Sequence, residues 1–143
     1  MLGLGIESTA HTFGIGIITD KGKILASALD AFKTEAGGLI PNELAKHHNE
    51  VKNKVLQNTL DQANINLKDI DLISFSQGPG MPMSLYVGLH SARELAKKYK
   101  VPLVGVNHLV AHLEIGKELT EIKDPVFILA TGANTQIIFF EGK

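Results

Sequence analysis

The order of strand-like and helical segments is the feature that most constrains the fold of this chain. Three short apolar segments come first, at 2–8, 14–19 and 24–30, and only a few turn residues separate them. Strands joined by turns this short pair antiparallel, so the start of the chain predicts a three-stranded meander. After residue 40, helical and strand patterns alternate, which is typical of crossover helices packed on a sheet.

Three later segments have helical spacing of apolar residues, at 41–64, 82–99 and about 107–119. Pro41 and Pro82 begin the first two, because proline suits the first turn of a helix. Strands are expected between and after them, at 71–76, 103–106, 126–130 and 136–140. The order βββ-α-β-α-β-α-ββ predicts an α/β fold of the ribonuclease-H-like, actin-like ATPase class. We expect a mixed sheet with an antiparallel three-strand meander and packed helices.

Composition narrows the class of protein further. A length of 143 residues favours one domain, so we expect a single lobe over 1–143. Hydrophobic residues make up 44% and charged residues 20%, which excludes a disordered or fibrous chain. A net charge of −1 gives no general attraction for nucleic acid, and the absence of cysteine excludes disulfides. With no signal peptide and no membrane-length apolar run, we expect a soluble, cytoplasmic protein with no membrane contact.

His108 and His112 are the first candidate site. Residues four apart lie on one face of a helix, so both imidazoles can bind one cation. The predicted helix begins just before them, and its dipole disfavours imidazolium there, which keeps both rings neutral. The chain has six histidines, which give roughly 0.2 chance pairs at this spacing, so the spacing alone leaves coincidence open as the alternative.

Three loops that follow strand ends are the other candidates. The segment 77–81 contains Gly78 and Gly80 and can bring backbone amides to an anion, although it also reads as a plain turn. The segment 131–136 can hold a phosphate or simply close a hairpin. Glu7-Ser8-Thr9 can contact a metal or phosphate or form a solvated turn. An α/β sheet binds ligands along its carboxyl edge, so together they predict a nucleotide-type cleft.

The remaining helical histidines are interpreted differently. His47 and His48 are adjacent on the first predicted helix, where one of them lies near the apolar stripe, and His90 lies inside the second. Histidines in such positions usually pack in the core, so we expect packing and not metal ligation for all three.

Four motifs follow one another in the order found in one known family. They are Gly-Ile-Glu-Ser-Thr at 5–9, Ser-Gln-Gly-Pro-Gly at 76–80, the stretch 105–114, and Gly-Ala-Asn-Thr-Gln at 132–136. Over essentially its whole length the chain resembles the N-terminal lobe of the tRNA N6-adenosine threonylcarbamoyltransferase family, called TsaD in bacteria and the catalytic subunit of the KEOPS complex elsewhere. Ser-Gln-Gly-Pro-Gly and Ala-His-Leu-Glu-Ile-Gly-Lys resemble the archaeal and eukaryotic branch.

This resemblance implies an activity and a set of site residues. The family transfers a threonylcarbamoyl group from threonylcarbamoyl-adenylate, made with ATP, to N6 of the tRNA adenosine 3′ to the anticodon. It implies one divalent metal ion, iron or zinc-like, held by His108 and His112. Beyond these metal ligands we assign no catalytic residue. The implied nucleotide contacts are Leu129, Ala130, Thr131, Gly132, Ala133 and Asn134, and the candidate cleft contacts are Glu7, Ser8, Thr9, Gly78 and Gly80.

Three departures from the family pattern bear on activity. Family members are roughly twice as long, so the C-terminal lobe, with an aspartate that completes the metal site, is absent from this chain. Ala133 replaces the second glycine of the nucleotide-binding turn, and Leu129 stands where archaeal relatives often have a tyrosine ligand. We therefore expect an incomplete metal site and an isolated chain that is inactive.

Two other functions compete with the transferase. The chain can serve as a non-catalytic scaffold that contacts KEOPS-type subunits, the small dimerising and the kinase-like one, through the helices at 41–64 and 82–99. A metalloprotease, an older label for the family, has little support. A zincin helix needs glutamate directly after its first histidine, and Leu109 occupies that position.

Overall fold

The computed structural model describes residues 1–34, 38–131 and 134–139. The chain divides into two compact units, Met1–His108 and Leu109–Lys143. The expectation of a single lobe over the whole chain stays a prediction.

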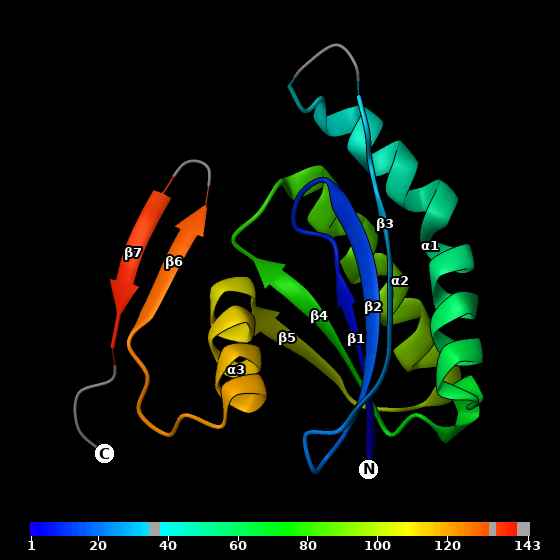
Figure 1. The fold of residues 1–143 in the computed structure, drawn as a ribbon. Helices are drawn as coiled ribbons and strands as arrows, with labels where there is room; N and C mark the ends of the chain where they lie inside the picture. The colour runs from blue at the N-terminus through cyan, green and yellow to red at the C-terminus, as the bar shows by residue number, and fades with distance from the viewer. Residues whose placement is uncertain (35–37, 132–133, 140–143) are drawn as a thin grey trace. The chain divides into compact units, whose positions relative to one another are not determined.

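A five-stranded mixed sheet forms the centre of the first unit, in the order β3-β2-β1-β4-β5 (Figure 1). The chain first makes an antiparallel meander, in which β2 pairs with both β1 and β3. It then adds β4 parallel to β1 and β5 parallel to β4, so the predicted mixed sheet is confirmed. The strand bounds are Leu2–Glu7 for β1, Thr12–Thr19 for β2, Ile24–Ala31 for β3, Leu72–Gly78 for β4 and Leu103–Asn107 for β5.

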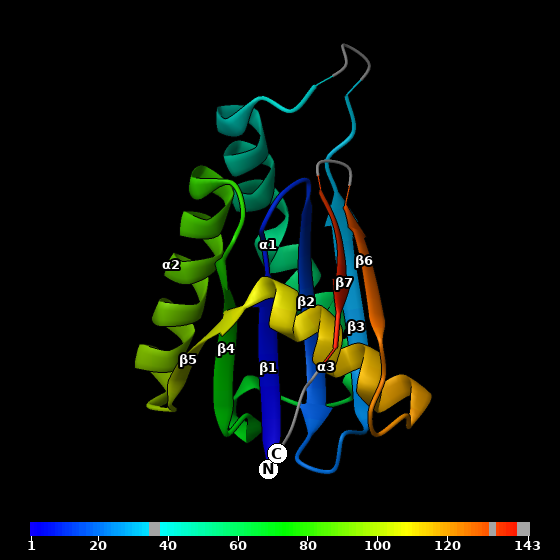
Figure 2. The same cartoon turned by 90° about the vertical axis from the view of Figure 1, so that its left-hand side faces the viewer.

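Two long helices, α1 (Pro41–Ala63) and α2 (Pro82–Tyr99), pack on this sheet and against each other (Figures 1 and 2). Both begin at proline as predicted, and each is followed by a left-handed cap residue, Asn64 or Lys100. A left-handed residue stops the helical backbone, so the chain can turn back towards the sheet and form the next strand. No helix in the part of the chain that the structure describes is long and apolar enough to cross a membrane.

A short 3₁₀ turn, η1 (Leu67–Asp69), was not expected from the sequence. Asn66 and Asp69 form a capping box, and the Asn66 backbone N–H donates to the Asp69 carboxylate at 2.9 Å. A three-residue turn is too short to show periodicity, so only its capping residues could have indicated it.

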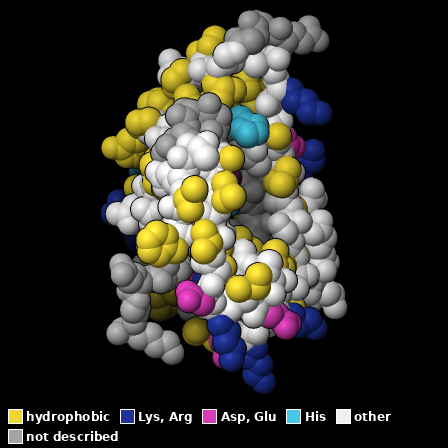
Figure 3. Space-filling view, turned by 60° about the vertical axis from the view of Figure 1, so that its left-hand side comes forward, with side chains coloured by type: hydrophobic (Ala, Val, Ile, Leu, Met, Phe, Trp, Pro, Cys, Tyr) yellow, Lys and Arg dark blue, Asp and Glu magenta, His cyan; other side chains and the backbone are white. Residues whose placement is uncertain are grey.

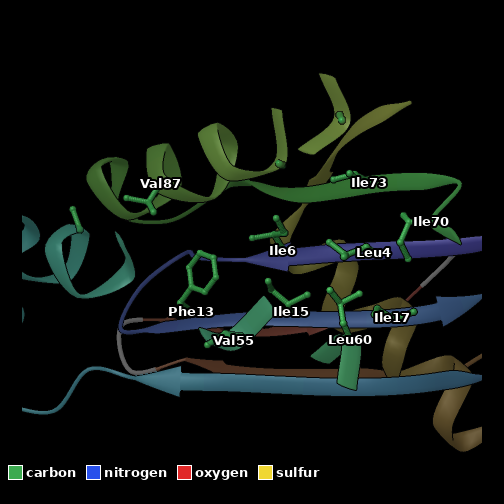
Figure 4. Close-up of a cluster of buried hydrophobic side chains, with 13 residues drawn as sticks. Leu4, Ile6, Phe13, Ile15, Ile17, Val55, Leu60, Ile70, Ile73 and Val87 are labelled. Carbon is green, nitrogen blue, oxygen red and sulfur yellow. The ribbon is translucent and has the colours of Figure 1, made fainter. Parts of the chain in front are cut away.

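The core lies between the meander and the two helices (Figure 4). Side chains alternate between the faces of a strand, so Leu4 and Ile6 of β1 point to the same side. Both are buried, as are the alternate residues of β2. The helices contribute Val55, Leu60 and Val87 to the same cluster. The fully or nearly fully buried strand residues are Leu4, Ile6, Phe13, Ile15, Ile17 and Ile73.

The second unit contains one helix and one hairpin. The helix α3 (His108–Thr120) has its first residue at the end of the first unit and continues through the second. The strands β6 (Phe127–Thr131) and β7 (Asn134–Ile138) pair antiparallel in a separate two-stranded sheet. Ile128 and Ile137 are cross-strand partners, and both are strongly exposed, at 74% and 70%. The last strand was expected at 136–140, and the observed β7 begins two residues earlier, at Asn134.

Truncating Leu4 tests the assignment of the core. Leu4 has no exposed surface, so Leu4→Ala should lower the free energy of unfolding by about 2–5 kcal/mol through lost burial and a residual cavity. Leu29→Ala, on β3 at 66% exposure, is the matched control and should change it by about 0.5 kcal/mol or less. Urea unfolding followed by circular dichroism measures both, and equal losses would contradict the assignment.

Candidate functional site

The loop after β1 and the loop before α2 come together at one edge of the sheet. Ser8 and Thr9 follow β1 and are buried, although a turn at this place could equally have been solvated. The Met81 backbone N–H donates to the Thr9 carbonyl at 2.7 Å, which joins the two loops. The structure thus brings the predicted cleft contacts of the first strand end close to those of the fourth.

Two glycines make this approach close. A Cβ built on Gly80 would lie 2.6 Å from the Thr9 carbonyl oxygen, so a side chain at Gly80 would push the loops apart. A Cβ on Gly88 in α2 would lie 2.1 Å from the Ser8 hydroxyl oxygen. Gly78 has a φ of 142°, a conformation that side chains disfavour. Gly78 and Gly80 are therefore required by the backbone, whatever they bind.

The Glu7 carboxylate organises the residues that follow it. It accepts a hydrogen bond from the Thr9 backbone N–H at 2.7 Å and a second, short one from the Thr9 hydroxyl. The same hydroxyl oxygen lies 3.4 Å from Nε2 of His108. Because the hydroxyl proton is directed to Glu7, the oxygen faces His108 as an acceptor. Glu7 and Thr9 are thereby connected to the first residue of α3.

His108 and His112 lie one turn apart on α3. The helix begins at His108, directly after β5, where a helix dipole favours neutral imidazole. Among the described residues, no group of three or more histidine, cysteine, aspartate or glutamate side chains could hold a metal ion. Metal binding by the two histidines stays a prediction.

The predicted nucleotide contacts lie around the β6–β7 turn. Leu129, Ala130 and Thr131 end β6, and Asn134 begins β7. Gly132 and Ala133 are outside the described residues. The hairpin reading of this turn agrees with the structure, and its contact with a nucleotide stays a prediction.

The other histidines divide into two kinds. His48 is fully buried and its Nε2 lies 3.0 Å from the Ala10 carbonyl oxygen, so its packing role is confirmed. Burial lowers the pKa of His48, an effect only partly offset by that hydrogen bond. His90 instead lies at the surface and stacks on Tyr86, so it packs without being part of the core. No sequence pattern indicated the contact between His48 and the Ala10 carbonyl.

Hydrophobic side chains are also exposed on α2, including Met83 and Tyr86 at 45% and 59%. Beside them is a pocket of about 350 Å³ lined by Phe75, Ser76, Gln77, Pro82, Leu85, Tyr86 and Leu89. On the face drawn in Figure 3, hydrophobic side chains lie among polar ones. Exposed apolar side chains beside a pocket, as on α2, are typical of a contact with another protein.

Sequence comparison identifies the family. The family model described as "TsaD: tRNA N6-adenosine threonylcarbamoyltransferase" matches residues 23–143, which is most of the chain. The chain belongs to the tRNA N6-adenosine threonylcarbamoyltransferase family. Archaeal proteins of that name match almost all of it, with 49% identity over 142 residues for Thermococcus sibiricus and 48% over 145 residues for Saccharolobus islandicus.

The chain spans less than half the length of these threonylcarbamoyltransferase relatives. It covers 43% of the Thermococcus sibiricus protein and 44% of the Saccharolobus islandicus protein, while 99% and 100% of the chain is matched. It therefore corresponds to an N-terminal portion of the family's proteins, as the resemblance implied.

Solved structures confirm the ribonuclease-H-like fold of this family member. YeaZ from Pseudomonas aeruginosa matches with a TM-score of 0.65 and 13% identity, over 96% of this chain and 63% of YeaZ. RuvC from T. thermophilus, solved with a Holliday junction, matches with a TM-score of 0.51 and 10% identity, over 86% of this chain and 80% of RuvC. At these identities the likeness establishes the fold alone.

Substituting Gly80 tests the contact between the two loops. Gly80→Ala should lower the free energy of unfolding by about 1–3 kcal/mol, because its Cβ meets backbone and not a flexible side chain. The matched control is Gly16→Ala in β2, where the nearest atom would be 3.8 Å away. Amide NMR signals of Thr9 and Met81 should move only in Gly80→Ala, and unchanged signals would argue against the close approach.

Proposed function

We propose that the full-length protein containing this chain transfers a threonylcarbamoyl group from threonylcarbamoyl-adenylate to N6 of the tRNA adenosine 3′ to the anticodon. The observation that carries the proposal is the family match over residues 23–143. This chain supplies the first lobe, and the remaining wall of the cleft comes from the portion of the relatives that it does not span. Taken alone, the 143-residue chain binds substrate weakly and is inactive.

A divalent metal ion fits the chemistry of the residues present. His108 and His112 offer two imidazole donors, the ligand type that suits iron and zinc. Two donors do not complete a site, so further ligands come from outside the described residues. When bound, such a metal polarises a carbonyl or phosphoryl oxygen of the substrate.

The chain's own residues orient this site. Thr9, fixed by Glu7, faces Nε2 of His108 and limits the rotation of its ring. The turn at 129–134 contacts the adenylate. Within the first unit, the loops at 7–9 and 78–80 lie together at the strand ends and offer the further cleft contacts. Holding the threonylcarbamoyl group next to the N6 amine of the adenosine lowers the barrier to transfer, because the two groups no longer have to find each other in solution.

A second candidate function is a scaffold that binds other subunits through α1 and α2. The exposed Met83 and Tyr86 and the adjacent apolar pocket favour it. The partners are KEOPS-type subunits, the small dimerising subunit and the kinase-like subunit. This function is compatible with the transferase, because Met83 and Tyr86 lie on α2, whereas Glu7, Thr9 and His108 lie at the ends of β1 and β5.

The double variant His108→Ala, His112→Ala tests the transferase. In the full-length protein it should fold normally and lose tRNA modification by at least about a hundredfold, because the metal loses both imidazoles. Nucleoside mass spectrometry of the tRNA measures the activity, and elemental analysis measures the metal. Glu118→Ala, at the exposed end of the same helix, is the control and should retain activity. Full modification by the double variant would reject the assignment.

Tyr86→Glu tests the partner surface. Tyr86 is 59% exposed, so the substitution should leave the unfolding midpoint nearly unchanged and weaken binding of the small dimerising subunit by about tenfold or more. Leu29→Glu, at a similarly exposed leucine of β3, should bind as the unmodified protein does. Isothermal titration calorimetry measures the affinity, and equal affinity for both variants would count against this surface.

A further inference from the structure

A partly buried chain of hydrogen bonds supports the β1–β2 loop from behind. Nε2 of His48 lies 3.0 Å from the Ala10 carbonyl oxygen. Nδ1 of His48 lies 3.2 Å from Nδ1 of His47, and Nε2 of His47 lies 3.0 Å from the Asp30 carboxylate. The chain runs from Asp30 in β3 through two adjacent residues of α1 to Ala10 in the loop.

Counting protons along this chain assigns the charge of both rings. The Ala10 carbonyl can only accept, so Nε2 of His48 carries a proton. The Asp30 carboxylate is also an acceptor, so Nε2 of His47 carries one as well. The two Nδ1 atoms can bond only if a third proton lies between them. Two rings with three protons carry one positive charge, which faces the negative charge of Asp30.

The surroundings place that charge on His47. His48 is fully buried, and this burial lowers its pKa and favours its neutral form. His47 and His11 lower the pKa of His48 further, while Glu7 on β1 raises it. Lys54 of α1 lies 3.7 Å from the other Asp30 oxygen and shares that carboxylate. His48 is thus a neutral donor, and His47 is the cation between it and Asp30.

Aromatic packing holds both rings in place. The ring of Phe13 lies 5.6 Å from that of His48, and the ring of Phe32 lies 5.6 Å from that of His47. The Phe32 backbone N–H, directly after β3, donates to the His11 carbonyl at 2.8 Å and supports the loop a second time. The hydrogen bond from His48 therefore has a fixed origin and can fix the peptide that accepts it.

The supported peptide joins Ala10 to His11 and lies one residue after Thr9. The Thr9 hydroxyl lies between Glu7 and His108, and Met81 holds the Thr9 carbonyl from the side of α2. The Ala10 residue connects this peptide to Thr9, so a rotation of the peptide is transmitted to Thr9 through the backbone of one residue. The donor behind Ala10 thus acts on the same loop as the contacts of Thr9 with Glu7 and Met81.

We propose that His48 is a positioning residue which, oriented by His47 and Asp30, fixes the Ala10 carbonyl and so holds Thr9 against Glu7 and His108. The hydrogen-bonded chain lies entirely within residues 1–108. Only its effect on transfer rests on the proposed function.

Two substitutions of His48 separate positioning from packing. His48→Gln places an amide donor near the position of Nε2, and His48→Leu fills the space without a donor. His48→Leu should increase amide exchange of residues 8–11 by about tenfold and shift the NMR signals of Thr9 and His108, while His48→Gln should restore both. Thr59→Val, another buried polar change in α1, is the control and should lower stability without moving these signals.

Two further measurements keep the test decisive if His48→Leu fails to fold. Imidazole ¹⁵N spectra of the unsubstituted chain should show protons on both nitrogens of His47 and on one nitrogen of His48. Asp30→Asn, at a partly exposed site, should remove the extra proton of His47 and speed exchange in the loop. Two unprotonated Nδ1 atoms, or equal signal shifts in His48→Leu and Thr59→Val, would overturn the proposal.

A kinetic readout connects His48 to the reaction. In the full-length protein, His48→Leu should lower kcat for tRNA modification with little change in KM for tRNA, and His48→Gln should recover most of the loss. If the NMR effects appear and kcat does not change, His48 positions Thr9 as proposed, but this positioning does not contribute to the transfer reaction. If no protein with intact His108 and His112 modifies tRNA, the proposed function fails and the NMR result still stands.

Discussion

The contact between the β1–β2 loop and the start of α2 is the constraint on which the site depends. It requires the absence of a side chain at Gly80 and Gly88, since a Cβ at either position would overlap Thr9 or Ser8. Because β1, β4 and β5 are parallel neighbours in the sheet, their carboxyl ends lie at one edge, where the two loops touch. Glu7, Thr9 and His108 meet there as a consequence of backbone packing.

Much of the fold could be predicted because its signals are local. Alternation of Leu4 and Ile6 with glycines marks β1, and prolines at 41 and 82 mark the helix starts within one residue. The rule that ligands bind at strand ends also selected the two loops that touch. The link from His48 to Ala10 joins residues 38 apart in sequence, and nothing in a His-His pair indicates which carbonyl it will meet.

Fold and family carry different amounts of functional information here. YeaZ and RuvC share the architecture at 13% and 10% identity, and RuvC was solved on a DNA junction. The architecture therefore supports unrelated chemistry. The proposed activity rests instead on the sequence family, which is matched over residues 23–143 and by relatives at 49% identity.

The β6–β7 hairpin has a practical consequence for work with this chain. Its cross-strand partners Ile128 and Ile137 are 74% and 70% exposed. Exposed apolar side chains on a strand pair favour association between molecules, so concentrated samples of this chain will tend to self-associate.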